Sequence, residues 1–250
     1  MARRPEETLD KTVSHFLPLS AVTAEEADRH YERVHTRFAR QLLRQRAHVV
    51  SYHTARAVAQ YDAAGGWAQR PRAFRFIVLR FLPGRGLELP EELRAAIVED
   101  HRAFLRELRP FRVREEVLFD RLRGQTALEK YVFELDRPEG VSRGAADAHL
   151  SARLRTLTDE AAATFGLRQL LVDHVLSEGA TEAVDEPGQR SLPHALADTP
   201  RQAFLELYFD HREWAEEFFA RAAVRAVLQD RYWQPIRGYR VVEKCGLDRR

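Results

Sequence analysis

The middle of the chain carries two short segments in which apolar and charged residues alternate. Residues 111–120 read Phe-Arg-Val-Arg-Glu-Glu-Val-Leu-Phe-Asp, and residues 128–135 read Leu-Glu-Lys-Tyr-Val-Phe-Glu-Leu. A period of two is typical of a β-strand with one buried and one polar face. We interpret the whole stretch as the join between the last strand of one unit and the first strand of a second unit of the same design.

The first half of the chain predicts the order strand, helix, strand, strand, helix, strand. Thr23 and Glu26 form a Thr-x-x-Glu capping box, which marks the start of the first helix. Pro90 begins the second helix and Pro110 ends it, while Gly65-Gly66 predicts a turn. The expected strands cover residues 12–19, 48–61, 74–82 and 111–119, and the expected helices cover residues 23–46 and 90–110.

The second half predicts the same order. The expected strands cover residues 128–135, 167–177, 203–210 and 236–244, the helices cover 142–165 and 211–233, and a loop rich in Gly, Pro and Asp covers 179–200. A βαββαβ unit is the ferredoxin-like arrangement, with two helices on one face of a four-stranded antiparallel sheet. We therefore expect an α+β protein with two tandem ferredoxin-like units, residues 12–122 and 126–245.

Two such units must also cover the sheet faces that their helices leave open. Packing the units sheet to sheet closes a fused α/β barrel around a central cavity. The alternative is two separate ferredoxin-like domains on a linker. The junction at Gly124-Gln125 is too short for a loose tether, so the sequence favours the fused barrel.

Composition narrows the class of protein and of partner. The chain has 250 residues, 44% of them hydrophobic, and a formal charge of +2 from 40 basic and 38 acidic residues. The two signs are interspersed, whereas nucleic-acid binders cluster basic residues on one face or tail, so we expect no nucleic-acid partner. No apolar run reaches the length of a signal peptide core or of a membrane span, about 18 residues. We expect a cytoplasmic protein that binds no membrane.

Motifs for bound cofactors are absent from the sequence. It contains no nucleotide-binding loop, nucleophile elbow or His-Glu-x-x-His. Cys245 is the single cysteine, which excludes a disulfide framework and a cysteine-based zinc site. His30 and His35 are five residues apart, about 140° around an α-helix, so they cannot jointly bind one metal from that helix. We therefore expect no metal and no other cofactor.

Strand alternation assigns side chains to the two faces of each strand. Apolar positions in the second unit are assigned to the helix-covered face, and the alternate positions then face the cavity. Cavity-facing positions are nearly all apolar in the first unit and largely polar in the second. We expect an apolar half that holds a ligand and a polar half that carries proton chemistry. The residues assigned to the cavity are Lys130, Val132, Glu134, Phe204, Glu206, Tyr208, Phe74, Phe76, Val78 and Arg80.

Asp173 and His174 are neighbours on a strand, so one of them points into the barrel. A carboxylate or an imidazole in an apolar cavity has its pKa displaced by desolvation, which suits a general acid or base near neutral pH. His15 and His53 on first-half strands raise the same possibility. For each of these residues, the alternative is a structural role at a rim or in an ion pair.

Two regions of the chain, one near each end, resemble a known family. The segment Ala24-Glu-Glu-Ala-Asp-Arg-His30-Tyr-Glu-Arg-Val-His35 is similar to the acidic, His-bearing first helix of the EthD family, within the dimeric α/β-barrel superfamily. The segments 214–219, 224–228 and 239–243 resemble the last helix and strand of that family. One departure is that Thr36-Arg-Phe follows His35, where the family usually has a Pro.

The resemblance implies an enzyme for small molecules. Relatives of this architecture include polyketide cyclases, muconolactone isomerases and cofactor-independent monooxygenases. We expect a cofactor-independent cyclase or isomerase for a hydrophobic, polyketide-like metabolite, and homodimerisation is left open. The catalytic candidates are Glu134, Glu206, Tyr208 and His174, with His35 added by the resemblance, and the substrate-binding candidates are Phe74, Phe76, Val78, Phe204 and Val132.

Three alternatives to this hypothesis stay open at the level of sequence. The first is a cofactor-independent monooxygenase, which would use a similar site. The second is a haem enzyme of the chlorite dismutase-like type, for which His174 would be the first axial ligand to test. The third is a stress-responsive binding barrel without catalysis.

Overall fold

The structure is a computed structural model of the whole chain. It describes residues 9–61, 66–68, 73, 75–85, 90–124, 128–179, 182–185, 189–191, 199–233 and 237–249, with the backbone alone described for 182–185 and 189–191. Phe74 and Gly65, both named in the sequence analysis, lie outside the described residues. No helix in these ranges is long and apolar enough to span a membrane.

The long strands and the helices of each half follow the predicted order of strand, helix, strand, strand, helix and strand. The first-half elements are β1 (Asp10–Pro18), α1 (Ala24–His30), a π-helical turn (Tyr31–His35), α2 (Thr36–Arg44), β2 (Val49–Tyr61), β3 (Trp67–Ala68), β4 (Arg75–Phe81), α3 (Glu91–His101) and β5 (Leu105–Asp120). The second-half elements are β6 (Glu129–Asp136), α4 (Arg143–Ala162), β7 (Leu167–Glu178), β8 (Glu182–Asp185), β9 (Gln189–Ser191), β10 (Arg201–Phe209), α5 (Arg212–Ala220), α6 (Ala222–Leu228), a 3₁₀ turn (Arg231–Trp233) and β11 (Arg237–Asp248).

The long strands form one closed antiparallel sheet. Within the described residues, eight strands follow one another in the order β1, β4, β2, β11, β6, β10, β7 and β5, and pairing of β1 with β5 closes the ring. The four strands of each half are neighbours, and the halves meet at two seams, β2 with β11 and β5 with β7. This closed sheet confirms the predicted α+β fold of the fused α/β-barrel type. The assignment of residues 12–122 and 126–245 to two tandem ferredoxin-like units stays a prediction.

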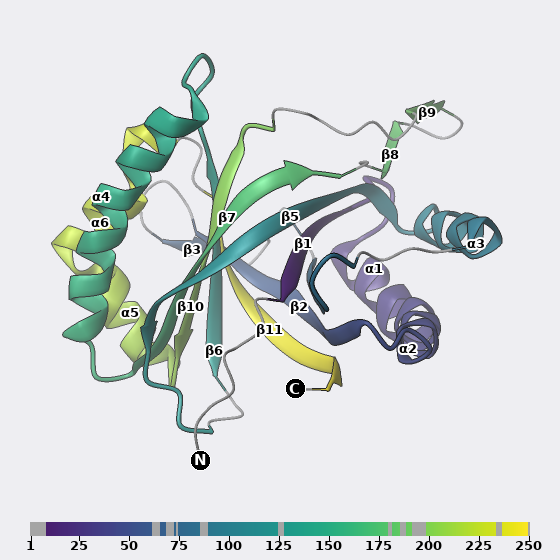
Figure 1. Cartoon of the computed structure of the whole chain (residues 1–250), viewed down its shortest axis with the longest axis horizontal. Helices are drawn as coiled ribbons and strands as arrows, with labels where there is room; N and C mark the ends of the chain where they lie inside the picture. The colour runs from purple at the N-terminus through teal and green to yellow at the C-terminus, as the bar shows by residue number, and fades with distance from the viewer. Residues whose placement is uncertain are drawn as a thin grey trace.

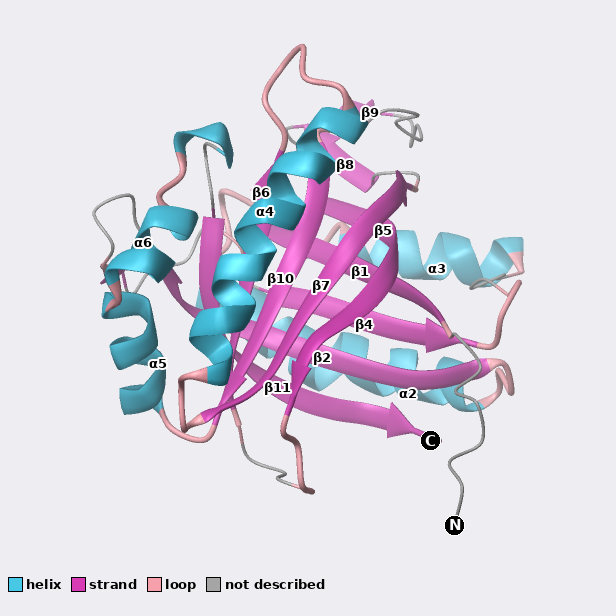
Figure 2. Cartoon of the chain, turned by 60° about the vertical axis from the view of Figure 1, so that its left-hand side comes forward, coloured by secondary structure: helices cyan, strands magenta, loops and turns pink. Residues whose placement is uncertain are grey.

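The helices cover the barrel on two opposite sides. Helices α1, α2 and α3 lie on one side, and α4, α5 and α6 lie on the other (Figures 1 and 2). The described residues therefore form three apolar clusters: one under each helical layer and one inside the barrel. The barrel-interior cluster includes Phe76, Val78, Val132 and Phe204, which confirms the predicted strand faces at these four positions.

A local signal in the sequence explains where helix α1 begins. The Thr23 Oγ1 atom accepts a hydrogen bond from the Glu26 backbone N–H, and the Glu26 carboxylate accepts one from the Thr23 backbone N–H. This reciprocal pair is the predicted capping box, and it satisfies two backbone donors that an uncapped helix would leave unpaired.

Three expected elements differ from the structure. Helix α3 ends at His101, so Phe104 is not helical and Leu108 lies in β5. Pro110 lies inside β5, where it pairs with Ser14 of β1, and it does not end a helix as predicted. The expected helix 211–233 is broken at Arg221, which is extended with ψ of 136°. The expected loop 179–200 contains the short strands β8 and β9.

Gly238 tests how tightly the seam between the halves is packed. A Cβ atom at this position would lie 2.3 Å from a ring carbon of Phe133 and 3.0 Å from the Cβ of Tyr61. We expect Gly238→Ala to lower the free energy of unfolding by about 1–3 kcal/mol, because a packed core resists an added methyl group. The control is Gly144→Ala in α4, where nothing lies within 4 Å and Ala should stabilise by about 0.5–1 kcal/mol. If urea unfolding gives Gly238→Ala the same free energy of unfolding as the wild-type protein, the position is not tightly packed.

Candidate active site

Two pockets formed by described residues could receive a ligand. The first, here called the helix-side pocket, has a volume of about 470 Å³ and lies between the outer face of the first-half strands and the helices α2 and α3. The second, here called the barrel pocket, has a volume of about 920 Å³ and opens from the barrel interior. Both volumes fall in the usual range for small-molecule sites. The helix-side pocket is lined mainly by apolar side chains, and the barrel pocket has many charged ones.

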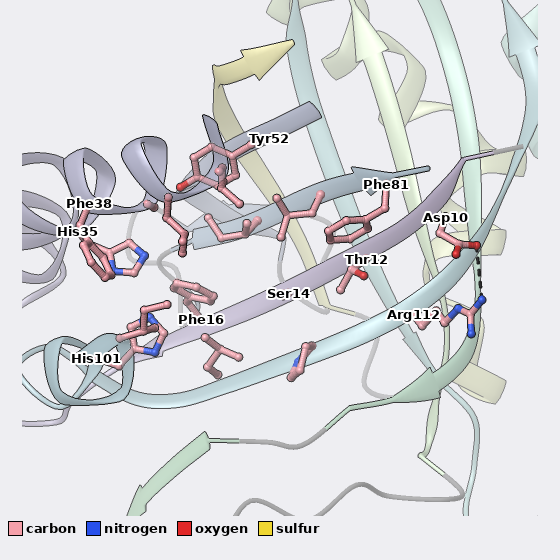
Figure 3. A pocket seen from close by; sticks show the side chains of 18 of the residues that line it. Asp10, Thr12, Ser14, Phe16, His35, Phe38, Tyr52, Phe81, His101 and Arg112 are labelled. Atoms are coloured by element: carbon pink, nitrogen blue, oxygen red, sulfur yellow. Dashed lines mark hydrogen bonds and ion pairs between the residues drawn. The ribbon is translucent and has the colours of Figure 1, made fainter. Parts of the chain in front are cut away.

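The walls of the helix-side pocket are mainly apolar, with two histidines at one end and a charged pair at the other. Figure 3 shows His35 and His101 at one end and Asp10 and Arg112 at the other. The Asp10 carboxylate and the Arg112 guanidinium are 3.4 Å apart. The apolar wall between these ends is formed by Phe16, Phe38, Ala39, Leu42, Leu43, Ile77, Leu79, Phe81, Ile97 and Leu108.

His35 is held by a carboxylate through one ring nitrogen. Its Nδ1 lies 2.7 Å from Oδ2 of Asp100 in α3, and Nε2 of His30 lies 2.8 Å from the other oxygen of the same carboxylate. A carboxylate on Nδ1 selects the tautomer in which Nε2 carries a lone pair. Since the edge of the His35 ring faces the pocket (Figure 3), Nε2 is the nitrogen available to accept a proton from a ligand.

A π-helical turn makes this arrangement possible. The backbone N–H of Thr36 donates to the carbonyl of Tyr31, an i to i+5 hydrogen bond. This widened turn brings His30 and His35 to the same side of the helix, which corrects the expectation that they diverge by about 140°. Single π-turns inside α-helices are frequent at functional sites, because they reposition side chains at some cost in backbone geometry.

The surroundings of His35 keep it uncharged. Burial lowers the pKa of His35 below its usual value of 6.5, and the neighbouring His101 and His30 add to this effect, while the hydrogen bond to Asp100 opposes it. The side chain is 9% exposed. His35 is therefore a neutral imidazole at pH 7, which is the form that a general base requires.

Two buried phenols complete the inner part of the pocket. The Tyr31 and Tyr52 hydroxyl oxygens are 2.5 Å apart, and the guanidinium of Arg75 lies 4.0 Å from the centre of the Tyr31 ring. Burial raises the pKa of Tyr31 well above 10, and it also raises the pKa of Tyr52. Both phenols stay protonated near neutral pH. Tyr52, which lines the pocket, is therefore available as a neutral hydrogen-bonding group.

The charged side chains that line the barrel pocket, and those buried beside it, already have partners. Lys11 of β1 lies 2.7 Å from Asp173, 2.7 Å from Glu206 and 2.6 Å from Glu115. Lys130 lies 2.5 Å from Glu206 and 2.5 Å from Glu243. Lys11 and Glu115 belong to the first half of the chain. The polar groups of the interior therefore come from both halves, and the expected division into an apolar half and a polar half is wrong.

This pairing determines the protonation of the interior carboxylates. Burial alone would raise the pKa of Glu206, but Lys11 and Lys130 lower it well below its usual range. Burial raises the pKa of Asp173 to about 7 in spite of Lys11, and Asp173 is hydrogen-bonded to Glu206. Three cations, Lys11, Arg80 and Lys130, face the carboxylates of Glu115, Asp173, Glu206 and Glu243. When Asp173 carries a proton, the three cations face three charged carboxylates, and the net charge of this cluster is zero.

Glu206 and Tyr208 line the barrel pocket as predicted, and Val78 shares it. The Tyr208 hydroxyl donates to Glu206 over 2.7 Å. Burial raises the pKa of Tyr208 well above 10. Glu206 is therefore a weak base and Tyr208 a weak acid at neutral pH.

Glu134 does not open onto the barrel pocket. It is fully buried and lies 2.8 Å from Nδ1 of His15 and 2.8 Å from Arg201, while Phe76 stacks on the His15 ring at 5.2 Å between centroids. The predicted single pocket containing Glu134, Glu206, Tyr208 and Phe76 is therefore wrong. Glu134 and Glu206 both point inward but lie at different levels along the barrel. Alternation predicts which face a residue occupies and does not predict its depth.

His174 is not in the interior either. Asp173 occupies the inward position, and His174 lies on the outer face, where its Nε2 is 2.9 Å from Glu116 of β5. The prediction that His174 lies in the cavity is therefore wrong. His174 cannot serve as an axial haem ligand inside the barrel, because its side chain points outward. Val132 and Phe204 belong to the apolar interior, and His35 lies in the helix-side pocket.

The sequence analysis missed Asp100, the carboxylate that orients His35. Asp100 follows Val98 and Glu99 near the end of a helix whose apolar stripe is weak, and nothing in its local sequence separates it from a surface carboxylate. It lies 65 residues from His35, and the two meet only because α1, α2 and α3 pack on the same side of the sheet (Figure 1).

Comparisons with known proteins support the fold and leave the activity open. An anthrone oxidase-like protein has a TM-score of 0.62 with 12% identity over 98% of this chain and 96% of its own. A candidate monooxygenase from Fusobacterium nucleatum has a TM-score of 0.54 with 5% identity over 96% of this chain and 94% of its own. Another from Lactobacillus acidophilus NCFM has a TM-score of 0.50 with 10% identity over 96% of both chains.

These structures share the dimeric α/β-barrel fold with this chain. No protein-family model and no curated protein sequence matches it. The resemblance to the EthD family in particular is therefore not shown.

The central role of Glu206 in the interior gives a stability prediction. We expect Glu206→Gln to lower the free energy of unfolding by about 3–5 kcal/mol, because it leaves Lys11 and Lys130 buried without their shared partner. The control is Glu216→Gln, which breaks an exposed pair with Arg212 at 2.7 Å and should cost less than about 0.5 kcal/mol. If chemical denaturation gives equal losses for the two variants, the interior charges are solvated and the assigned network is incorrect.

Proposed function

We propose that this protein is a cofactor-independent enzyme of the cyclase or isomerase type, in which His35 removes a proton from a hydrophobic, ring-sized metabolite in the helix-side pocket. The observation that carries the proposal is the neutral His35 imidazole, oriented by Asp100 and directed into an apolar pocket of about 470 Å³. Histidine is the side chain best suited to proton transfer near neutral pH, and a positioned base contributes about 10²–10⁴-fold to a rate.

The residues around His35 suggest how the step would proceed. Nε2 of His35 would take a proton from an acidic C–H or O–H of the substrate, and the electron pair left behind would delocalise onto a substrate oxygen as an enolate or phenolate. The imidazolium formed would be stabilised by Asp100, 2.7 Å away. Returning the proton to another carbon gives an isomer, and attack of the enolate carbon on a carbonyl within the same molecule gives a ring.

The shape and chemistry of the pocket favour a particular class of substrate. The wall between the two ends has aromatic and aliphatic side chains, which suits a flat or folded apolar body such as a polyketide-like ring system. The end opposite His35 presents Asp10 and Arg112 (Figure 3). A substrate with an apolar body and one polar tail would therefore bind with its tail at Arg112 and its reacting end at His35.

Oxygenation is the second candidate function. The carbanion or enolate produced by proton removal is also the species that a cofactor-independent monooxygenase passes to O₂. The shared fold with an anthrone oxidase-like protein and two candidate monooxygenases supports this possibility at the level of architecture. Stoichiometric O₂ uptake during turnover would select oxygenation, and turnover without O₂ would select cyclisation or isomerisation.

The role of His35 can be tested before the natural substrate is identified. A panel of phenols and β-diketones in D₂O would be screened by NMR for enzyme-dependent exchange of the acidic C–H. We expect His35→Gln to reduce exchange by about 10²–10⁴-fold, because it removes the base and keeps a side chain of similar reach. The matched control is His149→Gln, since His149 forms the same kind of pair with Asp230 at 2.9 Å under the other helical layer.

Full exchange activity in His35→Gln would overturn the proposal. Loss of activity in a folded Glu206→Gln variant, together with full activity in His35→Gln, would instead place the chemistry in the barrel pocket.

The pH dependence gives a second test of the pair formed by His35 and Asp100. Because the pKa of His35 is lowered, kcat/KM should rise with pH through an apparent pKa below 6.5 and stay level above it. The hydrogen bond that the Asp100 carboxylate accepts from His35 raises the pKa of His35, so Asp100→Asn should move the rising limb to lower pH and also reduce the plateau. A limb that moves to higher pH in this variant would contradict the assigned pair.

A further inference from the structure

The C-terminal end of β11 carries a bulge that changes the direction of its side chains. Cys245 pairs with His53 of β2, whereas Leu247 pairs with Tyr52 and Asp248 with Ser51, so the register shifts by one residue at Gly246. In a regular strand, residues three apart point to opposite faces. The extra residue of the bulge brings Cys245 and Asp248 to the same face, which is a common effect of β-bulges.

Packing explains why the bulge is at Gly246. A Cβ atom at this position would lie 2.4 Å from a ring carbon of Tyr52, so glycine is the residue that permits this close approach. The strand end beyond the bulge is anchored by Arg249. Its backbone N–H donates to the carbonyl of Val50 over 2.9 Å, and its guanidinium donates to the carbonyls of Arg46 and Arg44, each over 2.8 Å.

The bulge brings three potential metal-binding groups together. The ring nitrogen of His53, the thiol of Cys245 and the carboxylate of Asp248 each have a ligand atom within 4.8 Å of the other two. In the described part of the chain, this is the one group of three or more such residues at that spacing. All three side chains line the barrel pocket.

The two ring nitrogens of His53 have different surroundings, as in many metal-binding histidines. Its Nδ1 lies 3.7 Å from Oε1 of Glu243, a carboxylate that Lys130 holds at 2.5 Å. Its Nε2 is buried and has no hydrogen-bond partner among the described residues. Metal-bound histidines almost always present one nitrogen to a carboxylate or carbonyl and the other to the metal, which fixes the ring orientation.

We propose that His53, Cys245 and Asp248 form a binding site for a divalent transition metal of the Zn²⁺ class, with Glu243 as the outer carboxylate that orients His53. Thiolate, imidazole and carboxylate together are a donor set that Zn²⁺ binds, and calcium and magnesium prefer oxygen ligands alone. Three protein ligands leave a fourth position for water or a ligand group, as in catalytic zinc sites. That position faces the barrel pocket, where an anionic group could coordinate.

The single cysteine does rule out a site built from several cysteines, as the sequence analysis concluded. A mixed site assembled across two strands was not visible in the sequence, because residues 53 and 245 become neighbours only when the halves join at the seam between β2 and β11.

Co²⁺ binding tests the proposal, since cobalt replaces zinc and reports its ligands. The full-length, reduced protein would be titrated with Co²⁺. We expect one equivalent to bind and to produce a thiolate-to-cobalt charge-transfer band, which only Cys245 can supply because the chain has one cysteine. Zn²⁺ should abolish the band by competition, and it should protect Cys245 against a thiol reagent.

Variants distinguish the proposed site from metal bound by an exposed thiol alone. Asp248→Asn and His53→Ala should each weaken Zn²⁺ binding by at least about 10-fold, and Cys245→Ser should remove the band. The matched control is His211→Ala, another histidine of the barrel pocket, which should bind as the wild-type protein does. Binding that depends on Cys245 but is unchanged in Asp248→Asn and His53→Ala would overturn the proposal, as would the absence of any band. This outcome is independent of His35.

Discussion

Closure of the strands into one barrel is the constraint on which the rest of the structure depends. Strands that alternate polar and apolar residues can leave one face in water in an open sheet. In this chain both faces are covered, one by helices and one by the opposite wall of the barrel. Charged side chains on the inner face are therefore buried, and a buried charge is tolerated only when it is paired and hydrogen-bonded. The network around Lys11 and Lys130 meets that requirement.

This network also influences where a substrate can bind. Lys11 touches carboxylates from β5, β7 and β10, so it connects both halves through the barrel interior. A group held between two opposite charges is a poor proton acceptor, as the lowered pKa of Glu206 shows. The helix-side pocket differs, because its walls are mainly apolar and the neutral His35 imidazole lies at one end. The interior network stabilises the barrel, and we propose that the substrate binds in the space under α2 and α3.

Much of the fold could be predicted because its signals are local. Alternation identified the inward positions of Val132, Phe204 and Glu206, and the capping box identified the first helix. Pro110 was misinterpreted, because a proline that ends a helix and a proline that lies within a strand look alike in the sequence. The barrel topology shows where the chain tolerates it, since Pro110 pairs with Ser14 inside the closed sheet.

The candidate site was harder to predict because its geometry is not local. The resemblance singled out His35, but the spacing of His30 and His35 was judged on a regular α-helix, and the π-turn that brings both to Asp100 leaves no pattern in the sequence. The same limit applied to Glu134, whose depth in the barrel depends on strand tilt and register. The bulge at Gly246 is a third case, since a glycine near a chain end is common and its effect depends on Tyr52.

The most direct test of this account is the position of a bound apolar ligand. A crystal of the protein soaked with 1-naphthol, a fused-ring phenol, would show which pocket receives a flat apolar molecule. We expect density between α2, α3 and the outer face of β1 and β4, with the hydroxyl within about 3–3.5 Å of the Nε2 atom of His35. Density inside the barrel beside Glu206 and Tyr208, with the helix-side pocket empty, would contradict the account.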